Sequence, residues 1–161
     1  MKCCYVDKLK IENKVQYFLR SSNDMYIIME PSKYLKHKMM EHCSPNTIRR
    51  IAYSLCYYIE FLQERDLTME QVLLLKYAEQ YEHFVNFLLW LQAGKHSERK
   101  ELPRNNTCNS YLQAVFGYYE FVLLEYEKDG DIKVLEGRDI SYSGVAGVQF
   151  KRNVNTFRGY L

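Results

Sequence analysis

The sequence predicts a mainly α-helical fold preceded by a small antiparallel β element. Apolar residues recur at three- and four-residue steps in several segments between residues 31 and 128, which is the pattern of helices with one buried face. Helix-start residues and glycines mark the ends of these segments. The first 30 residues lack this period and contain short β-type runs divided by turn residues.

The β element lies within residues 1–30. Runs at 5–11 and 15–19 are separated by a short polar segment, and a third run at 25–29 follows a Ser-Ser-Asn-Asp turn. We therefore expect either a hairpin or a three-stranded meander. So few residues cannot build an independent core, and the element must pack on the helices or on another chain.

A long helix is expected from Ser44 to about residue 65, after a short helix at about 31–41. Ser44 is a good N-cap, and Pro45 suits the first helical position, where no N–H is needed. One face is apolar and consists of Ile48, Ile51, Ala52, Leu55, Ile59 and Leu62. The opposite face carries Arg49, Arg50, Tyr53, Ser54 and Tyr57. Two arginines and two tyrosines are more than solubility requires, so this face is a candidate binding surface.

Three further helices follow. Thr68 and Gln71 form a capping-box pattern, which predicts a short helix, a break, and then a helix over about 79–92 that Gly94 ends. The last helix is expected to begin at Asn105 or Asn106, both good caps, and to run to about residue 128. Its outward face near the start is expected to carry Asn106, Asn109, Ser110 and Gln113.

Residues 131–161 show no helical period, and glycines punctuate their short apolar pieces. We expect no further core from this segment and interpret it as an extended linker. The expected organisation is thus a β appendage at 1–30, a helical domain at 31–130, and a linker at 131–161 toward an absent C-terminal catalytic domain.

Composition excludes several classes of protein. The chain has 161 residues, is 47% hydrophobic and carries a formal net charge of +2, so it has enough apolar residues for one folded domain. No apolar run is long enough to span a membrane, and the N-terminus lacks a signal-peptide core, so an intracellular location is expected. The five cysteines include no CxxC pair, and we therefore expect neither a structural zinc site nor any cofactor.

The small net charge conceals three basic segments. They lie at 33–50, in the loop at 95–104 and near the C-terminus, whereas acidic residues gather in the middle and at the end of the last helix. Segregated positive charge is typical of a protein that binds an anionic partner on one side, although solvated loops give the same pattern. Catalytic motifs are missing from the sequence, which contains no GxGxxG, P-loop, HExxH or GxSxG. Binding is therefore the expected chemistry.

Several short motifs of apolar and polar residues follow one another along the helical segments. They are SPNTI at 44–48, Tyr53, FL at 61–62, FLLWL at 87–91, and NTxNxxLxxVFxxY at 106–119 followed by Phe121. Over about residues 31–128 this order resembles the N-terminal, SAM-like core-binding domain of phage-type integrases, the tyrosine recombinases. The hairpin, and FKR at 150–152 with FRGYL at 157–161, are similar to the flanks of integrases from transposons and integrative elements.

The resemblance implies an orthogonal bundle of four to five helices that closes over one face of duplex DNA while a separate catalytic domain grips the other. The family's catalytic residues belong to that second domain, and no HxxR occurs here, so the chain is expected to bind DNA without cleaving it. Tyr160 lies in the expected linker and is not the nucleophile. Other recombinase protomers on DNA are expected partners, in the bacterial cytoplasm and at the nucleoid, with no membrane or small-molecule partner.

The first hypothesis is therefore duplex DNA binding. The phosphate-binding candidates are Arg49, Arg50, Lys95, Arg99, Lys100 and Arg104. Candidates for contacts to base edges, sugars or phosphates are Thr47, Asn106, Asn109 and Gln113, with Tyr53 and Tyr57 on the same helix face as the arginines. Lys151, Arg152 and Arg158 are expected to follow the DNA from the linker. The alternative is a helical protein–protein interaction module, because tyrosine and arginine are also enriched at protein interfaces.

Overall fold

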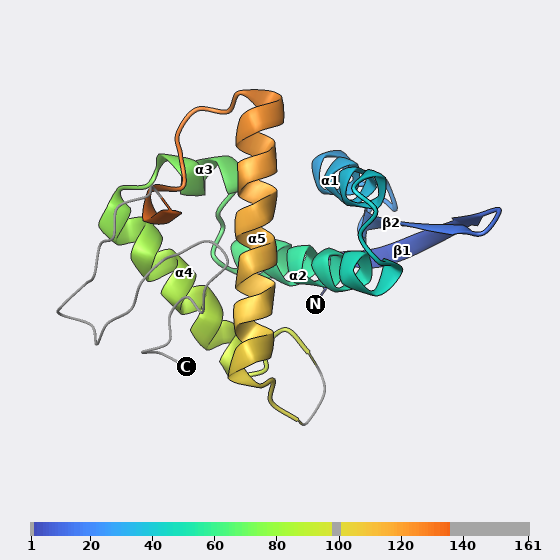
Figure 1. The fold of residues 1–161 in the computed structure, drawn as a ribbon. Coiled ribbons are helices and arrows are strands. Elements are labelled where there is room, and N and C mark those ends of the chain that lie inside the picture. The colour runs from blue at the N-terminus through green and yellow to red at the C-terminus, as the bar shows by residue number, and fades with distance from the viewer. Residues whose placement is uncertain (1, 98–100, 136–161) are drawn as a thin grey trace. The chain divides into compact units, whose positions relative to one another are not determined.

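The computed structural model describes residues 2–97 and 101–135 of the chain (Figure 1). The fold is mainly helical and begins with a two-stranded antiparallel hairpin, as the sequence predicts. The chain divides into two compact units between Asp66 and Leu67. We call residues up to Asp66 the N-terminal unit and the described residues from Leu67 onward the C-terminal unit. The division falls inside the segment 31–130 that was expected to form one helical domain.

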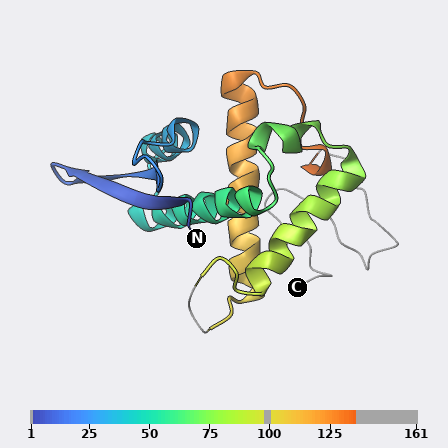
Figure 2. The same ribbon diagram turned by 180° about the vertical axis from the view of Figure 1, so that it is seen from behind.

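The N-terminal unit contains the strands β1 (Cys4–Ile11) and β2 (Lys14–Ser21) and the helices α1 (Met29–Met40) and α2 (Pro45–Glu64). The strands pair in register from Cys4 opposite Ser21 to Ile11 opposite Lys14. Both strands contact α2, and Figure 2 shows the hairpin beside that helix from behind. The hairpin therefore shares a core with the two helices, which a pair of strands alone could not provide.

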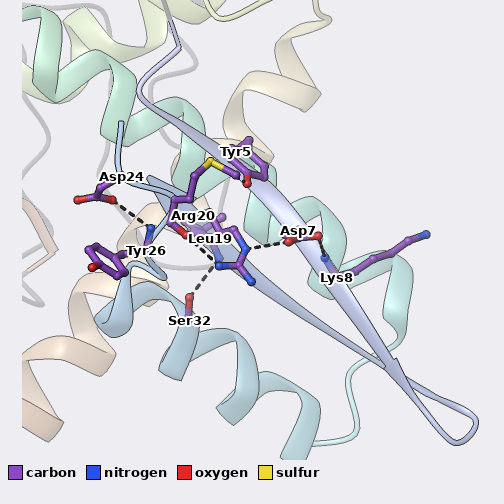
Figure 3. Close-up of polar contacts among 9 residues, drawn as sticks. Tyr5, Asp7, Lys8, Leu19, Arg20, Asp24, Tyr26 and Ser32 are labelled. Carbon is purple, nitrogen blue, oxygen red and sulfur yellow. Dashed lines mark hydrogen bonds and ion pairs between the residues drawn. The ribbon is translucent and has the colours of Figure 1, made fainter. Parts of the chain in front are cut away.

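Of the hairpin and the three-stranded meander, the structure contains the hairpin. Residues 25–29 contribute only an isolated bridge between Arg20 and Ile27, and α1 already begins at Met29. A turn takes the place of the third strand. Oδ1 of Asp24 accepts a hydrogen bond from the backbone N–H of Tyr26, and Met25 has a left-handed φ of 66°. The guanidinium of Arg20 holds this turn by donating to the carbonyl of Met25 (Figure 3).

Helix α2 begins at Pro45, and the side chain of Ser44 accepts a hydrogen bond from the N–H of Thr47, as an N-cap should. Most of the predicted inner stripe is buried, from Ile48 to Leu62, whereas Ile59 is half-buried. The prediction for Ser54 is wrong. It is fully buried, and its hydroxyl donates to the carbonyl of Arg50 at 2.7 Å, which satisfies a polar group that would otherwise be costly to bury.

The C-terminal unit contains the helices α3 (Met69–Leu74), α4 (Tyr77–Gln92) and α5 (Asn105–Tyr126) and the 3-10 helix η1 (Lys133–Leu135). The predicted capping box is present, since Thr68 and Gln71 exchange both side chain–backbone hydrogen bonds. Helices α4 and α5 pack through Phe84, whose ring centroid lies 4.9 Å from that of Phe116. Gly94 follows α4 with a φ of 72°, as a helix-ending glycine does.

Helix α5 begins as expected at Asn105, but its cap differs. The N-cap is Arg104, which has extended backbone angles and makes no side-chain capping hydrogen bond. Asn105 and Asn106 are thus the first residues of the helix and not its cap. Propensity ranks candidate caps, but the backbone path of the preceding loop decides which residue takes the position.

Ile132 and Val134 belong to the core of the C-terminal unit, so the expectation of no further core from residues 131–161 is wrong for this short segment. Ile132 and Val134 are 2% and 3% exposed. The N–H of Asp131 donates to the carbonyl of Leu73 at 3.1 Å, which brings this segment against α3. Gly130 makes the approach possible: its φ is 92°, and a Cβ there would lie 2.4 Å from the same carbonyl oxygen. The remaining residues of the expected linker, 136–161, lie outside the described residues.

Candidate nucleic-acid interface

The outer face of α2 carries an arginine and two tyrosines in one line. Arg49, Tyr53 and Tyr57 are spaced four residues apart, so their side chains follow one another along the helix. The guanidinium carbon of Arg49 lies 5.1 Å from the centroid of the Tyr53 ring, and the rings of Tyr53 and Tyr57 are 6.2 Å apart. We call these three residues the α2 stripe. Cation–π contact pre-positions the guanidinium and leaves its N–H groups available to an anion.

Arg50 adds a second exposed cation beside the stripe. Among the described residues, neither Arg49 nor Arg50 forms an ion pair with a carboxylate. Thr47 is half-buried, and its hydroxyl lies 2.9 Å from that of Ser44, so it supports the N-cap. Within the described part of the chain no carboxylate neutralises the two arginines, so their positive charges are available to a phosphate group.

A hollow of about 440 Å³ lies beside the start of α2. The hairpin turn contributes Lys14, the end of α1 contributes Met39 and Met40, and the turn before α2 contributes Ser44. Lys14 was not among the binding residues predicted from the sequence. Its proximity to α2 depends on the packing of the hairpin, which a local pattern does not contain.

The predicted residues of the C-terminal unit lie at the end of α4 and the start of α5. Lys95, Arg104 and Asn106 are exposed. The neighbouring residue His96 is buried, with its ring centroid 6.0 Å from that of Trp90 in α4 and 6.0 Å from that of Tyr111 in α5. This aromatic cluster fixes the first turn of the basic loop. The basic character of the loop at 95–104 did not indicate that His96 is buried.

The amide face predicted for α5 is only partly at the surface. Asn109 is 7% exposed, and its Oδ1 is buried with no hydrogen-bond partner among the described residues, so its assignment as an outward DNA contact is wrong. Gln113 is half-buried. Asn109 lies three residues before Leu112 and seven before Phe116, both fully buried, and therefore falls on the inward stripe of the helix.

The remaining candidates cannot be assigned a place. Arg99 and Lys100 of the loop, and Lys151, Arg152 and Arg158 near the C-terminus, lie outside the described residues. The structure therefore brings together the α2 stripe in the N-terminal unit and exposes Lys95, Arg104 and Asn106 in the C-terminal unit. That both sets line one surface stays a prediction.

In the part of the chain that the structure describes, no helix combines the length and the apolar character needed to cross a membrane. No protein-family model matches the chain, and no solved structure matches it.

By sequence, the chain is related to a transposon-encoded transposase. The relative is "Transposase A from transposon Tn554" of Staphylococcus aureus strain Mu50, which is 24% identical over 143 residues, covering 83% of this chain and 38% of the transposase. The same protein of strain N315 shows the same identity and coverage. The chain therefore spans well under half the length of these relatives.

Proposed function

We propose that the chain binds duplex DNA as the core-binding part of a site-specific recombinase, of the tyrosine recombinase or integrase class, encoded by a mobile element. The observation that carries this proposal is the α2 stripe together with Arg50. These residues present two exposed arginines next to two half-buried tyrosines, and neither arginine forms an ion pair with a carboxylate among the described residues. The similarity to a transposon transposase supports a nucleic acid as the anionic partner.

The chemistry of each group fits a contact to the DNA backbone. Arginine forms bidentate hydrogen bonds to phosphate oxygens, and the tyrosine hydroxyls add neutral contacts to phosphate or sugar. Lys95 and Arg104 supply further cations from the C-terminal unit, and Asn106 supplies an amide for a base edge or a sugar. In this proposal Arg99, Lys100, Lys151, Arg152 and Arg158 extend the phosphate contacts. Phosphate contacts position a protein on DNA without reading sequence, so much of the affinity is sequence-independent.

The proposal assigns binding and not strand cleavage to this chain. Recombination then requires catalytic residues supplied by a further part of the recombinase, and other protomers at the same DNA site. The chain works in the bacterial cytoplasm, at the nucleoid, and needs no cofactor for this binding role.

A salt series tests the proposal directly. The chain is titrated into a fluorescently labelled duplex at several salt concentrations, and binding is followed by anisotropy. We expect the logarithm of the association constant to fall linearly with the logarithm of the salt concentration, by about 0.9 for each phosphate contacted. Absence of binding at low salt by the folded chain would refute the proposal.

A second function has its own supporting observation. Met25, Tyr26, Ile27 and Met29 are each more than two-fifths exposed in the segment that joins β2 to α1, and Tyr26 is 74% exposed. Contiguous exposed apolar residues favour a protein contact. A Tyr26→Ser, Ile27→Ser variant would lose self-association in sedimentation experiments if this segment binds another protomer, while DNA binding by the single chain would be unchanged.

A further inference from the structure

Three side chains that can bind metal meet inside the N-terminal unit. Cys4 is the first residue of β1, and Cys56 and Glu60 lie one turn apart on α2. The two sulfurs and one carboxylate oxygen all lie within 4.8 Å of one another. Cys4 and Cys56 are separated by 52 residues, so no local spacing motif announces the pair. We call the three residues the Cys–Cys–Glu cluster.

The carboxylate of Glu60 is buried and lacks a hydrogen-bond partner for one oxygen among the described residues. That oxygen is Oε1, and Glu60 is only 9% exposed. Burial raises the pKa of this carboxyl above its ordinary value, and the charges of Lys2 and the N-terminus oppose that shift less strongly. A buried carboxylate in a stable protein is ordinarily paired or bound to a metal.

The thiols are equally enclosed. Cys4 is 0% exposed and Cys56 is 4% exposed, with their sulfurs 2.7 Å apart. Sγ of Cys56 donates to the carbonyl of Cys4 at 3.2 Å. Hydrogen bonds with Cys3 and Cys56, followed by burial, raise the pKa of the Cys4 thiol. A cation at the cluster would favour the thiolate instead, because metal binding releases thiol protons.

We propose that Cys4, Cys56 and Glu60 form a binding site for one zinc ion, with two thiolates and one carboxylate as the protein ligands. Thiolate sulfur and carboxylate oxygen are both ordinary zinc ligands, and residues four apart on a helix present their side chains to one ion. The fourth position of the tetrahedron belongs to water or to the adjacent thiol of Cys3.

A zinc ion would give a partner to all three side chains of the Cys–Cys–Glu cluster, whereas a disulfide would join the two cysteines alone. A tetrahedral zinc with Zn–S bonds of about 2.3 Å holds its two sulfurs about 3.8 Å apart, so the thiols must separate by about 1 Å to admit the ion. A disulfide needs a slightly smaller movement, to about 2.05 Å, but it leaves the buried oxygen of Glu60 without a partner. Only the metal satisfies all three groups.

The proposed ion would fasten β1 to α2. The hairpin supplies Cys4 and the helix supplies the other two ligands, so metal binding would stabilise the folded N-terminal unit relative to the unfolded chain. This role is independent of DNA binding, because Arg49 and Arg50 are exposed on α2 whereas the cluster is buried.

Metal analysis of the whole chain tests the proposal. The chain is purified under reducing conditions without chelator, and its zinc content is measured by mass spectrometry. We expect about one zinc per chain, removable by a strong chelator. Reloading the stripped chain with Co²⁺ should give thiolate-to-cobalt charge-transfer absorption in the near ultraviolet and the strong visible bands of a tetrahedral site.

Matched variants locate the site. Cys4→Ser with Cys56→Ser should abolish both the zinc content and the charge-transfer band, whereas Cys43→Ser, at a cysteine outside the cluster, should change neither. If circular dichroism shows that the double variant does not fold, Glu60→Gln provides the second test because it keeps the side-chain size. We expect it to weaken zinc binding at least tenfold in competition with a chromophoric chelator, and to abolish most of the increase in melting temperature that added zinc gives the stripped wild-type chain.

Two results would overturn the proposal. One is a reduced, folded wild-type chain that holds no zinc and shows no charge-transfer band with Co²⁺. The other is peptide mapping that finds Cys4 and Cys56 joined as a disulfide in the purified chain.

Discussion

The guanidinium group of Arg49 lies over the ring of Tyr53, with its carbon 5.1 Å from the ring centroid. The contact restricts the conformations of the arginine side chain, and the ring does not neutralise the charge of the guanidinium group. Arg50, next along the helix, carries a second charge without an ion-pair partner in the described part of the chain. This pair is the basis of the first prediction.

Arg49→Ala with Arg50→Ala should reduce the salt dependence of DNA binding. Each lost phosphate contact lowers the slope of log K against log salt by about 0.9, so the double variant should lose about two units of slope. Anisotropy titrations with a labelled duplex measure this. Arg65→Ala is the matched control, since Arg65 directly follows α2 and lies over Phe61, beyond the α2 stripe. An unchanged slope in the double variant would remove both arginines from the interface.

Gln80→Leu should destabilise the C-terminal unit strongly. The buried Gln80 amide donates to the carbonyls of Val72 and Asp131 and accepts from the N–H of Lys133. Leucine keeps the volume but removes three hydrogen bonds, at about 1 kcal/mol each, so the free energy of unfolding should fall by about 3 kcal/mol. The carbonyl of Asp131 and the N–H of Lys133 lose their partner, whereas the carbonyl of Val72 keeps the hydrogen bond from the N–H of Leu75. Urea denaturation followed by the fluorescence of Trp90 measures it. Glu82→Ala, on an exposed position of α4, should stay within about 0.5 kcal/mol of the wild type.

Thr68→Ala should weaken the start of α3. The threonine hydroxyl accepts from the N–H of Gln71 at 3.1 Å, and losing such a cap costs about 1 kcal/mol. Thr68→Ser retains the hydroxyl and should retain most of the stability in the same urea assay. Equal losses in both variants would show that the methyl group, and not the hydrogen bond, matters at this position.

Gly130→Ala should be more harmful than Gly94→Ala, although both glycines have positive φ. A Cβ at Gly130 would meet the backbone oxygen of Leu73 at 2.4 Å, and the backbone cannot yield cheaply. At Gly94 the nearest atom is Cδ2 of the exposed Leu102, at 2.9 Å, and this side chain can move. We expect Gly130→Ala to lose about 3 kcal/mol or more and Gly94→Ala about 1 kcal/mol. Thermal and urea unfolding compare the two, and equal losses would contradict the close approach at Gly130.

Asp7→Asn should make the N-terminal unit less stable at neutral pH and indistinguishable from the wild type in acid. The hydrogen bond from Arg20 is the first cause that lowers the pKa of Asp7, and the N–H of Lys8 is the second. Because the folded pKa lies below the ordinary value of about 3.9, the stabilisation is fully present above that value and is lost as the pH falls through the folded pKa. Urea unfolding followed by circular dichroism, at about pH 7 and in a series of acid pH values down to about pH 2, measures the difference.

The sequence predictions that the structure confirms depend on interactions between residues close together in the chain. The start of α2 at Pro45, the capping box at Thr68 and the break between α3 and α4 depend on residues within one turn of each other. The hairpin depends on short alternating runs and a polar turn. Each of these signals depends on neighbouring residues alone, and therefore the packing of distant segments does not change the local structure that it predicts.

The missed features depend on contacts between distant segments. Ile132 and Val134 are buried because Gly130 lets the chain return to α3, and Cys4 meets Cys56 because the hairpin packs on α2. For Asn109 and Glu60 a signal was present. Each lies on the buried stripe of its helix by spacing, Glu60 four residues after Cys56, but polarity favoured an outward position. A polar residue on an apolar stripe should therefore be considered as a buried functional group.

The return of the chain to α3 also fixes how far residues 131–135 can reach. They are held by Leu73 and Gln80 against the C-terminal unit. An extended residue spans about 3.4 Å, so these five would reach about 17 Å if they were released. Gln80→Leu would therefore change the path of the chain after Gly130 as well as destabilise the core.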